Sequence, residues 1–287
     1  MKYLPKQLDD LGIEQRFALD IGSVIAGVRP RGLLHVSADL QHGLEKLLNS
    51  YGLCVEATRK LYRGNDSTSR EGVLNQLPCE PTAEIWCEVW YSNAEVAPID
   101  QAALFGNPGK FLGYPECCRR SLEGKDALAR LYQRYLLEDS YRYWELNRLA
   151  TLFHNTILMP DFFPCSMSCE SARNYVIPFH DVAVSVFTDD YLLSAKNAMR
   201  APITIIGNKV VQWSDWKCDK ERLWVTASGA RKDPIDRISS YLSISEPSTA
   251  LLVGFNHLFG LECVLAPNKL TININGRDAI DLPLKLI

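Results

Sequence analysis

The sequence lacks a long apolar run and a large excess of either charge. No run of apolar residues reaches the roughly 18 to 20 that a membrane-spanning helix needs, so we expect no membrane span. The net charge is −3 over 287 residues, and such a balance does not favour nucleic acid or an anionic membrane surface as a partner. Residues 1–17 also lack the apolar core of a signal peptide. We therefore expect a cytoplasmic protein with a small-molecule substrate or a protein partner.

Several motifs of familiar enzyme classes are absent as well. There is no G-x-S-x-G and no G-x-G-x-x-G. The glycine-containing stretch 106–110 ends in a lysine that Phe111 follows, so it lacks the Ser or Thr of a phosphate-binding loop and is interpreted as a turn. The dipeptide His180-Asp181 stands without the further histidines of a metal phosphohydrolase. The C-x₃-C at 165–169 is followed by Ala172 where a radical S-adenosylmethionine enzyme has its third cysteine.

Cysteine, in contrast, is well represented, and four of the nine cysteines lie in two similar motifs. The motifs are Gly113-Tyr114-Pro115-Glu116-Cys117-Cys118 and Pro164-Cys165-Ser166-Met167-Ser168-Cys169. In each, a proline precedes the cysteines at the predicted start of a helix, where its missing N–H costs nothing. The free N–H groups and the positive dipole end of a first turn stabilise a thiolate. In a reducing compartment, such clusters favour metal or redox chemistry over disulfides.

The two motifs differ in how their sulfurs can be used. Cys165 and Cys169 are four residues apart, which on a helix places both on one face with Cβ atoms about 6 Å apart, close enough to share one zinc or one cluster. Neighbours on a helix point about 100° apart, so we expect only one of Cys117 and Cys118 to bind the metal. An open three-ligand catalytic site and a closed four-sulfur structural site both remain possible.

These residues predict a metal site formed by Cys117, Cys118, Cys165 and Cys169. Thiolates at helix starts suit an anionic iron–sulfur (4Fe-4S) cluster, and only one motif has the close spacing of a zinc knuckle, so we expect a cluster, with zinc as the alternative. The predicted function is a metal-dependent enzyme of small-molecule metabolism, such as a biosynthetic enzyme. The alternatives are a zinc-stabilised, non-catalytic binding protein and a metal-free, thiol-dependent enzyme.

The paired motifs resemble a family of uncharacterised prokaryotic domains with Gly-Tyr-Pro-x-Cys-Cys followed by Pro-Cys-Ser-x-x-Cys. The matching positions are Gly113, Tyr114, Pro115, Cys117 and Cys118, then Pro164, Cys165, Ser166, Cys169 and Glu170. The resemblance implies a thiolate site at these positions and no established reaction. One departure is Phe163, near which the family pattern leads us to expect a polar residue, often histidine.

The hydrophobic pattern predicts an α/β protein, or an α+β one, with a mixed sheet, a helical middle segment that carries the cysteine motifs, and a β-rich C-terminal third. The expected helices are 37–51 (capped by Ser37 and ended by Gly52), 98–105, 126–152, 169–176 and 189–199. The expected strands are 53–57, 84–91 and 222–226, with hairpins at 203–211 and 270–282 and a loop at 64–81. We expect a domain over 1–200 and a β-rich region over 201–287, which either stands alone or completes the first domain.

The remaining candidates have ordinary structural explanations beside their functional ones. His154 is a candidate fourth ligand or general acid–base, or else a partly exposed capping residue. Arg119 and Arg120 can bind an anionic substrate, or simply form a solvated helix face. Cys54, Cys87 and Cys263 lie in apolar, strand-like runs and are expected to be buried.

Overall fold

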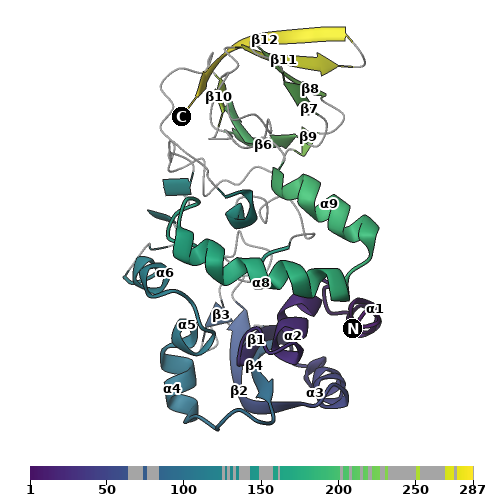
Figure 1. Cartoon of the computed structure of the whole chain (residues 1–287), viewed down its shortest axis with the longest axis vertical. Coiled ribbons are helices and arrows are strands. Elements are labelled where there is room, and N and C mark those ends of the chain that lie inside the picture. Colours follow the sequence, from purple (N-terminus) through teal and green to yellow (C-terminus); the bar gives the residue numbers. More distant parts are fainter. Residues whose placement is uncertain are drawn as a thin grey trace. The chain divides into compact units, whose positions relative to one another are not determined.

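The structure is a computed structural model (Figure 1). It describes residues 1–63, 74–75, 84–124, 127, 130–131, 134–135, 143–148, 158–160 and 162–200, and then the strands from residue 203 to 286. The chain divides into two compact units. One comprises Met1–Arg119, Leu158–Phe162 and Tyr175–Leu192, and the other comprises Arg120–Ile157, Phe163–Asn174 and Leu193–Ile287.

The first unit contains an antiparallel sheet with the strand order β1-β4-β2-β3. Its strands are β1 (Arg31–Ser37), β2 (Leu53–Arg63), β3 (Leu74–Asn75) and β4 (Glu84–Asn93). Strand β4 is rich in aromatic and β-branched residues and is buried on both faces from Cys87 to Ser92. The predicted 84–91 strand is therefore confirmed. Strand β2 continues beyond the predicted 53–57, and β3 falls within the predicted 64–81 loop, whose remaining residues lie outside the described part.

Helices cover both faces of this sheet (Figure 1). On one side lie α1 (Leu4–Asp10), α2 (Phe17–Ile25) and α3 (Gln41–Ser50), and on the other lie α4 (Gln101–Gly106) and α5 (Pro108–Phe111). The Cys87 thiol of β4 donates to the Gln41 side chain of α3 at 3.0 Å. The Trp90 ring, on the opposite face, packs in a core with Leu104 and Leu112. Alternate residues of β4 therefore serve two different cores.

The helix predicted over 37–51 begins later than expected. Ser37 is the last residue of β1 and pairs with Trp86, so it does not cap the helix. Leu40 is the cap residue instead, without a side-chain hydrogen bond. The predicted end is confirmed, because Gly52 has a φ of +75°, the left-handed conformation that glycine adopts readily. The helix predicted over 98–105 corresponds to α4, which Asp100 caps through the amide of Ala103.

The helical middle segment contains α6 (Glu116–Ser121), the 3₁₀ turn η1 (Trp144–Leu146), α8 (Glu170–Val186) and α9 (Asp189–Arg200). The single helix predicted over 126–152 is wrong at its C-terminal end, because Tyr143 is extended and η1 follows it. Helix α8 continues ten residues beyond the predicted end at 176, with Pro178 inside it. Among the described residues, no helix is long and apolar enough to cross a membrane.

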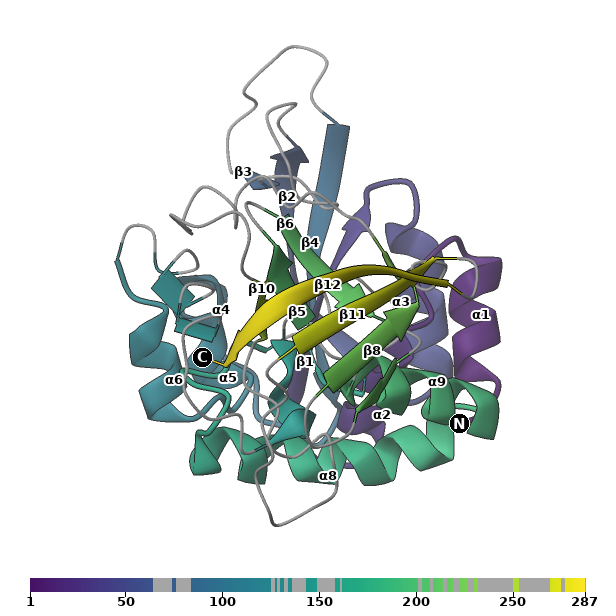
Figure 2. The same ribbon diagram turned by 90° about the horizontal axis from the view of Figure 1, so that it is seen from above.

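The C-terminal strands form a second, mixed sheet in the order β7-β8-β11-β12-β10-β5-β6-β9 (Figure 2). The strands are β5 (Ile203–Ile206), β6 (Lys209–Trp213), β7 (Trp216–Cys218), β8 (Arg222–Thr226), β9 (Ala230–Arg231), β10 (Ala250–Leu252), β11 (Lys269–Ile274) and β12 (Arg277–Leu286). Both predicted hairpins are confirmed by the antiparallel pairs β5–β6 and β11–β12. The combination of helices and sheets confirms the predicted α/β class. The division of the chain into domains at residue 200 stays a prediction.

Candidate metal centre

The first cysteine motif begins a helix, as its sequence predicts. Gly113 has a φ of +78°, which favours glycine and turns the chain into Tyr114 and Pro115. The Pro115 carbonyl accepts the amide hydrogens of Cys118 and Arg119, both at 3.0 Å, and so receives the first hydrogen bonds of α6. Cys117 and Cys118 therefore lie in the first turn of that helix. Cys118 is completely buried, whereas Cys117 is exposed.

The second motif does not begin a helix at Pro164, because α8 begins at Glu170. The Ser166 hydroxyl accepts the amide hydrogen of Ser168 at 2.9 Å, and the Ser166 carbonyl accepts that of Cys169 at 3.2 Å. Serine side chains often compete in this way with regular helical bonding. The prediction that the two cysteines of this motif share one helical face is therefore wrong. They lie at the two ends of a serine-stabilised turn.

Cys169 is the cap residue of α8, directly before its first residue, Glu170. Its carbonyl accepts the amide hydrogen of Arg173 at 3.0 Å, the first bond of the helix. Its sulfur accepts the amide hydrogen of Ala172 at 3.4 Å. This is the position where a serine or aspartate oxygen usually caps a helix. The amides at a helix start favour a negatively charged group, such as a metal-bound thiolate.

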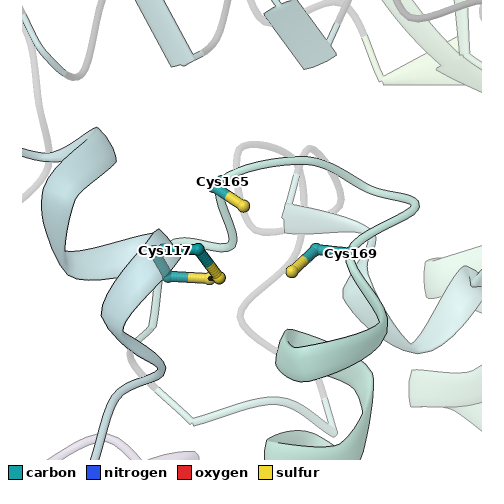
Figure 3. A group of neighbouring side chains, drawn as sticks. Cys117, Cys165 and Cys169 are labelled. Atoms are coloured by element: carbon teal, nitrogen blue, oxygen red, sulfur yellow. Dashed lines mark hydrogen bonds between the residues drawn. The ribbon is translucent and has the colours of Figure 1, made fainter.

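The four cysteines converge on one point, although they come from distant parts of the chain. Figure 3 shows the side chains of Cys117, Cys165 and Cys169 pointing towards one another. Their sulfur atoms all lie within 4.8 Å of one another. The sulfurs of the adjacent Cys117 and Cys118 are 3.8 Å apart, so the two side chains do not diverge as expected. Four cysteines at this spacing can hold a metal ion. Which of the sulfurs bind it stays a prediction.

Two neighbouring residues of the middle segment hold the backbone of the second motif. The buried Tyr135 hydroxyl donates to the Pro164 carbonyl, and the Arg134 guanidinium donates to the Cys165 carbonyl at 2.8 Å. Both residues lie in the stretch predicted as a helix over 126–152. Their bonds to the motif depend on tertiary contact, for which the sequence carries no local signal.

Phe163 also has a specific environment. The Arg148 guanidinium lies 4.2 Å from the centre of its ring, a cation–π contact. The family resemblance leads us to expect a polar residue near this position. The chain has instead an aromatic ring in contact with a cation.

A group of aromatic rings, missed by the sequence analysis, lies next to the first motif. The ring centre of Tyr114 is 5.0 Å from that of Phe162 and 5.7 Å from that of Tyr175. The Tyr175 hydroxyl donates to the carbonyl of Leu112 at 3.1 Å. Burial raises the pKa of Tyr175 to about 12, with the nearby Arg29 opposing the shift, so the hydroxyl keeps its proton near neutral pH.

Of the other predicted residues, those that the structure describes do not join the sulfur group. His154 and Cys263 lie outside the described residues. Cys54 is exposed, contrary to expectation. Cys87 is buried as expected, and burial raises the pKa of its thiol. Arg120 is exposed, and Arg119 is half-buried with its carbon chain beside Gly109.

Comparison with known proteins finds one family that matches part of the chain. A family described as "Protein of unknown function (DUF483)" matches residues 88–185. No curated protein and no solved structure is similar enough to the chain to count as a match. Residues 88–185, which include all four clustered cysteines, are thus similar to this uncharacterised family, in agreement with the expected resemblance to an uncharacterised domain family.

Proposed function

We propose that Cys117, Cys118, Cys165 and Cys169 bind a single zinc ion through four thiolates and that the ion stabilises the fold around it. The observation that carries the proposal is the convergence of all four sulfurs within 4.8 Å of one another. Thiolates are the ligands that zinc and iron–sulfur clusters prefer. Structural zinc sites are usually closed by four such ligands in a tetrahedron.

The spacing of the sulfurs favours one ion over a cluster. Around a tetrahedral ion with bonds of about 2.3 Å, two ligand sulfurs lie about 3.8 Å apart. The sulfurs of Cys117 and Cys118 have this separation. An iron–sulfur cluster places its own irons and sulfides between the cysteines and needs a wider cage. The cluster expected from the sequence is therefore the second choice of cofactor.

Zinc would stabilise the fold by joining segments that are far apart in the sequence. One ligand pair lies in the first turn of α6, and the other brackets the turn before α8. Because only the folded chain brings these segments together, the ion binds the folded state and not the unfolded one. The binding free energy of a structural zinc ion therefore contributes to folding.

A second candidate function is a metal-dependent enzyme of small-molecule metabolism, and one observation favours it. Cys117 is exposed, so one side of the bound metal would face solvent. If substrate replaces that ligand, the site becomes a three-ligand site with an open position, where zinc or a cluster iron polarises a bound oxygen.

Metal analysis of the anaerobically purified full chain tests the proposal. We expect one zinc per chain, no sulfide and no absorbance near 400 nm. Cys169→Ser should lose the zinc, although the serine hydroxyl can still cap α8. The matched control is Cys54→Ser, which changes an exposed cysteine outside the group and should keep the zinc.

Other outcomes decide against the proposal. Brown protein that contains iron and sulfide would show that the site holds a cluster and not a single zinc ion. Folded protein that takes up neither zinc nor iron would overturn both the zinc site and the cluster. Substitution of cobalt(II) for zinc distinguishes a closed structural site from an open catalytic site. Added imidazole leaves the spectrum of a closed four-sulfur site unchanged but alters that of an open site.

A further inference from the structure

Helix α8 connects Cys169, one of the four clustered cysteines, to Tyr175. Cys169 caps the helix, with its carbonyl bonded to the Arg173 amide and its sulfur bonded to the Ala172 amide. Tyr175 follows six residues later, about 9 Å along a helix with a rise of 1.5 Å per residue. Because the helix between them is hydrogen-bonded, a contact that fixes Tyr175 also fixes the sulfur of Cys169.

The hydroxyl of Tyr175 is bonded to the turn that leads into the first motif. It donates to the Leu112 carbonyl at 3.1 Å. That turn has its own backbone bonds, from the Gly113 amide to the Lys110 carbonyl at 3.2 Å and from the Tyr114 amide to the Gly109 carbonyl at 2.9 Å. The carbonyl that Tyr175 binds is therefore held in place, five residues before Cys117.

The ring of Tyr175 also contacts the segment that precedes the second motif. Its centre lies 5.0 Å from that of Phe162, a fully buried residue two positions before Pro164. It lies 5.3 Å from the ring of Phe179, which is one turn further along α8. One side chain thus contacts the approach to each cysteine motif.

We infer that Tyr175 is a positioning residue of the metal centre, whose hydroxyl and ring hold the start of α8 in register with the turn before Cys117. The inference rests on the proposed metal site. Metal ligands must be held within about 0.5 Å of their working positions. If the start of α8 can shift relative to the turn before Cys117, bringing the four sulfurs around one ion therefore costs more free energy. Residues outside the ligand set commonly tune metal affinity in this way.

Tyr175→Phe tests the inference because it removes the hydrogen bond and keeps the ring. The matched control is Tyr91→Phe, which removes another buried hydroxyl that, like that of Tyr175, interacts with Arg29 but, among the hydrogen bonds of the described residues, makes none to the turn before Cys117. The rate at which the zinc-loaded full chain releases its ion to a chromogenic chelator is measured for both. A net hydrogen bond corresponds to roughly a three- to tenfold change. We expect release to accelerate by that factor in Tyr175→Phe and to stay unchanged in Tyr91→Phe.

The melting temperatures of the metal-free proteins separate positioning from general stability. If Tyr175 is a positioning residue, Tyr175→Phe releases zinc faster even when the metal-free variants have the same melting temperature. The inference is overturned if Tyr175→Phe releases zinc at the wild-type rate, or if Tyr91→Phe is accelerated equally. A wild-type protein that holds no metal overturns the proposed function together with this inference, whereas a metal-bound wild type with unchanged variants overturns the inference alone.

Discussion

At the scale of single residues, close contacts decide which side chain a position accepts. Gly32 lies opposite Tyr91 in the β1–β4 pairing. A Cβ at Gly32 would lie 2.1 Å from the Cζ atom of Tyr91 and 2.3 Å from its hydroxyl oxygen, closer than two such atoms can approach. Tyr91 is completely buried, so its ring has little room to move away. Glycine is required here for space.

Gly32→Ala is therefore expected to lower the free energy of unfolding by about 1–3 kcal/mol, the range of an overpacked core. Urea denaturation of the variant and the wild type measures the difference. Gly106→Ala is the matched control, since its Cβ would meet nothing within 4 Å. A change at Gly32 as small as that at Gly106 would contradict the steric argument.

At the scale of elements, one buried carboxylate joins three strands of the first sheet. Glu88 on β4 pairs with His35 on β1 and with Arg59 on β2. Its carboxylate accepts hydrogen bonds from the Arg59 guanidinium and, at 2.8 Å, from the Trp90 indole. Burial alone would raise the pKa of Glu88, but hydrogen bonds from His35, Arg59 and Trp90 lower it to about 2.

This lowered pKa predicts how acid affects the sheet. A carboxyl that ionises more readily in the folded state stabilises it above its unfolded pKa, near 4.5, and the gain is lost as the pH falls towards 2. We expect Glu88→Gln to be less stable than the wild type at pH 6 and the difference to shrink between pH 4.5 and 2. Denaturation of the metal-free protein across this range measures it.

The exposed Glu95→Gln serves as the control for the charge change. It should differ little from the wild type at any pH, because exposed substitutions usually change stability by less than about 0.5 kcal/mol. A stability gap for Glu88→Gln that is constant with pH would rule out the ionised carboxylate as its cause.

At the scale of the whole molecule, the proposed zinc ion couples folding to metal supply. A ligand that binds only the folded chain adds about 2.7 kcal/mol of stability at a free concentration one hundred times its Kd. We expect the melting temperature of the chelator-treated protein to rise progressively as zinc is returned. Cys165→Ser, measured in the same titration, should show no such rise. Equal responses of the two proteins would place the stabilising zinc elsewhere.

The features that the sequence predicted well depend on neighbouring residues. Strand β4 was predicted from its run of aromatic and β-branched residues, and the hairpin of β11 and β12 from an Asn-Gly turn. The first cysteine motif begins a helix because its Pro115 stands directly before the first residue of α6. The start of α3 was missed because Ser37, a good capping residue, is occupied by sheet pairing. There a tertiary contact overrode a local preference.

The sequence by itself singled out the four cysteines as candidates, because proline, glycine and serine around each pair form motifs that can be recognised without a fold. It also determined the helical start at Cys117 and Cys118, which depends on adjacent backbone atoms. Only the tertiary structure decided that their two sulfurs meet those of Cys165 and Cys169 within 4.8 Å. Only it decided that Tyr175 bonds to Leu112. Such contacts join distant segments, and their geometry depends on the packing of all that lies between.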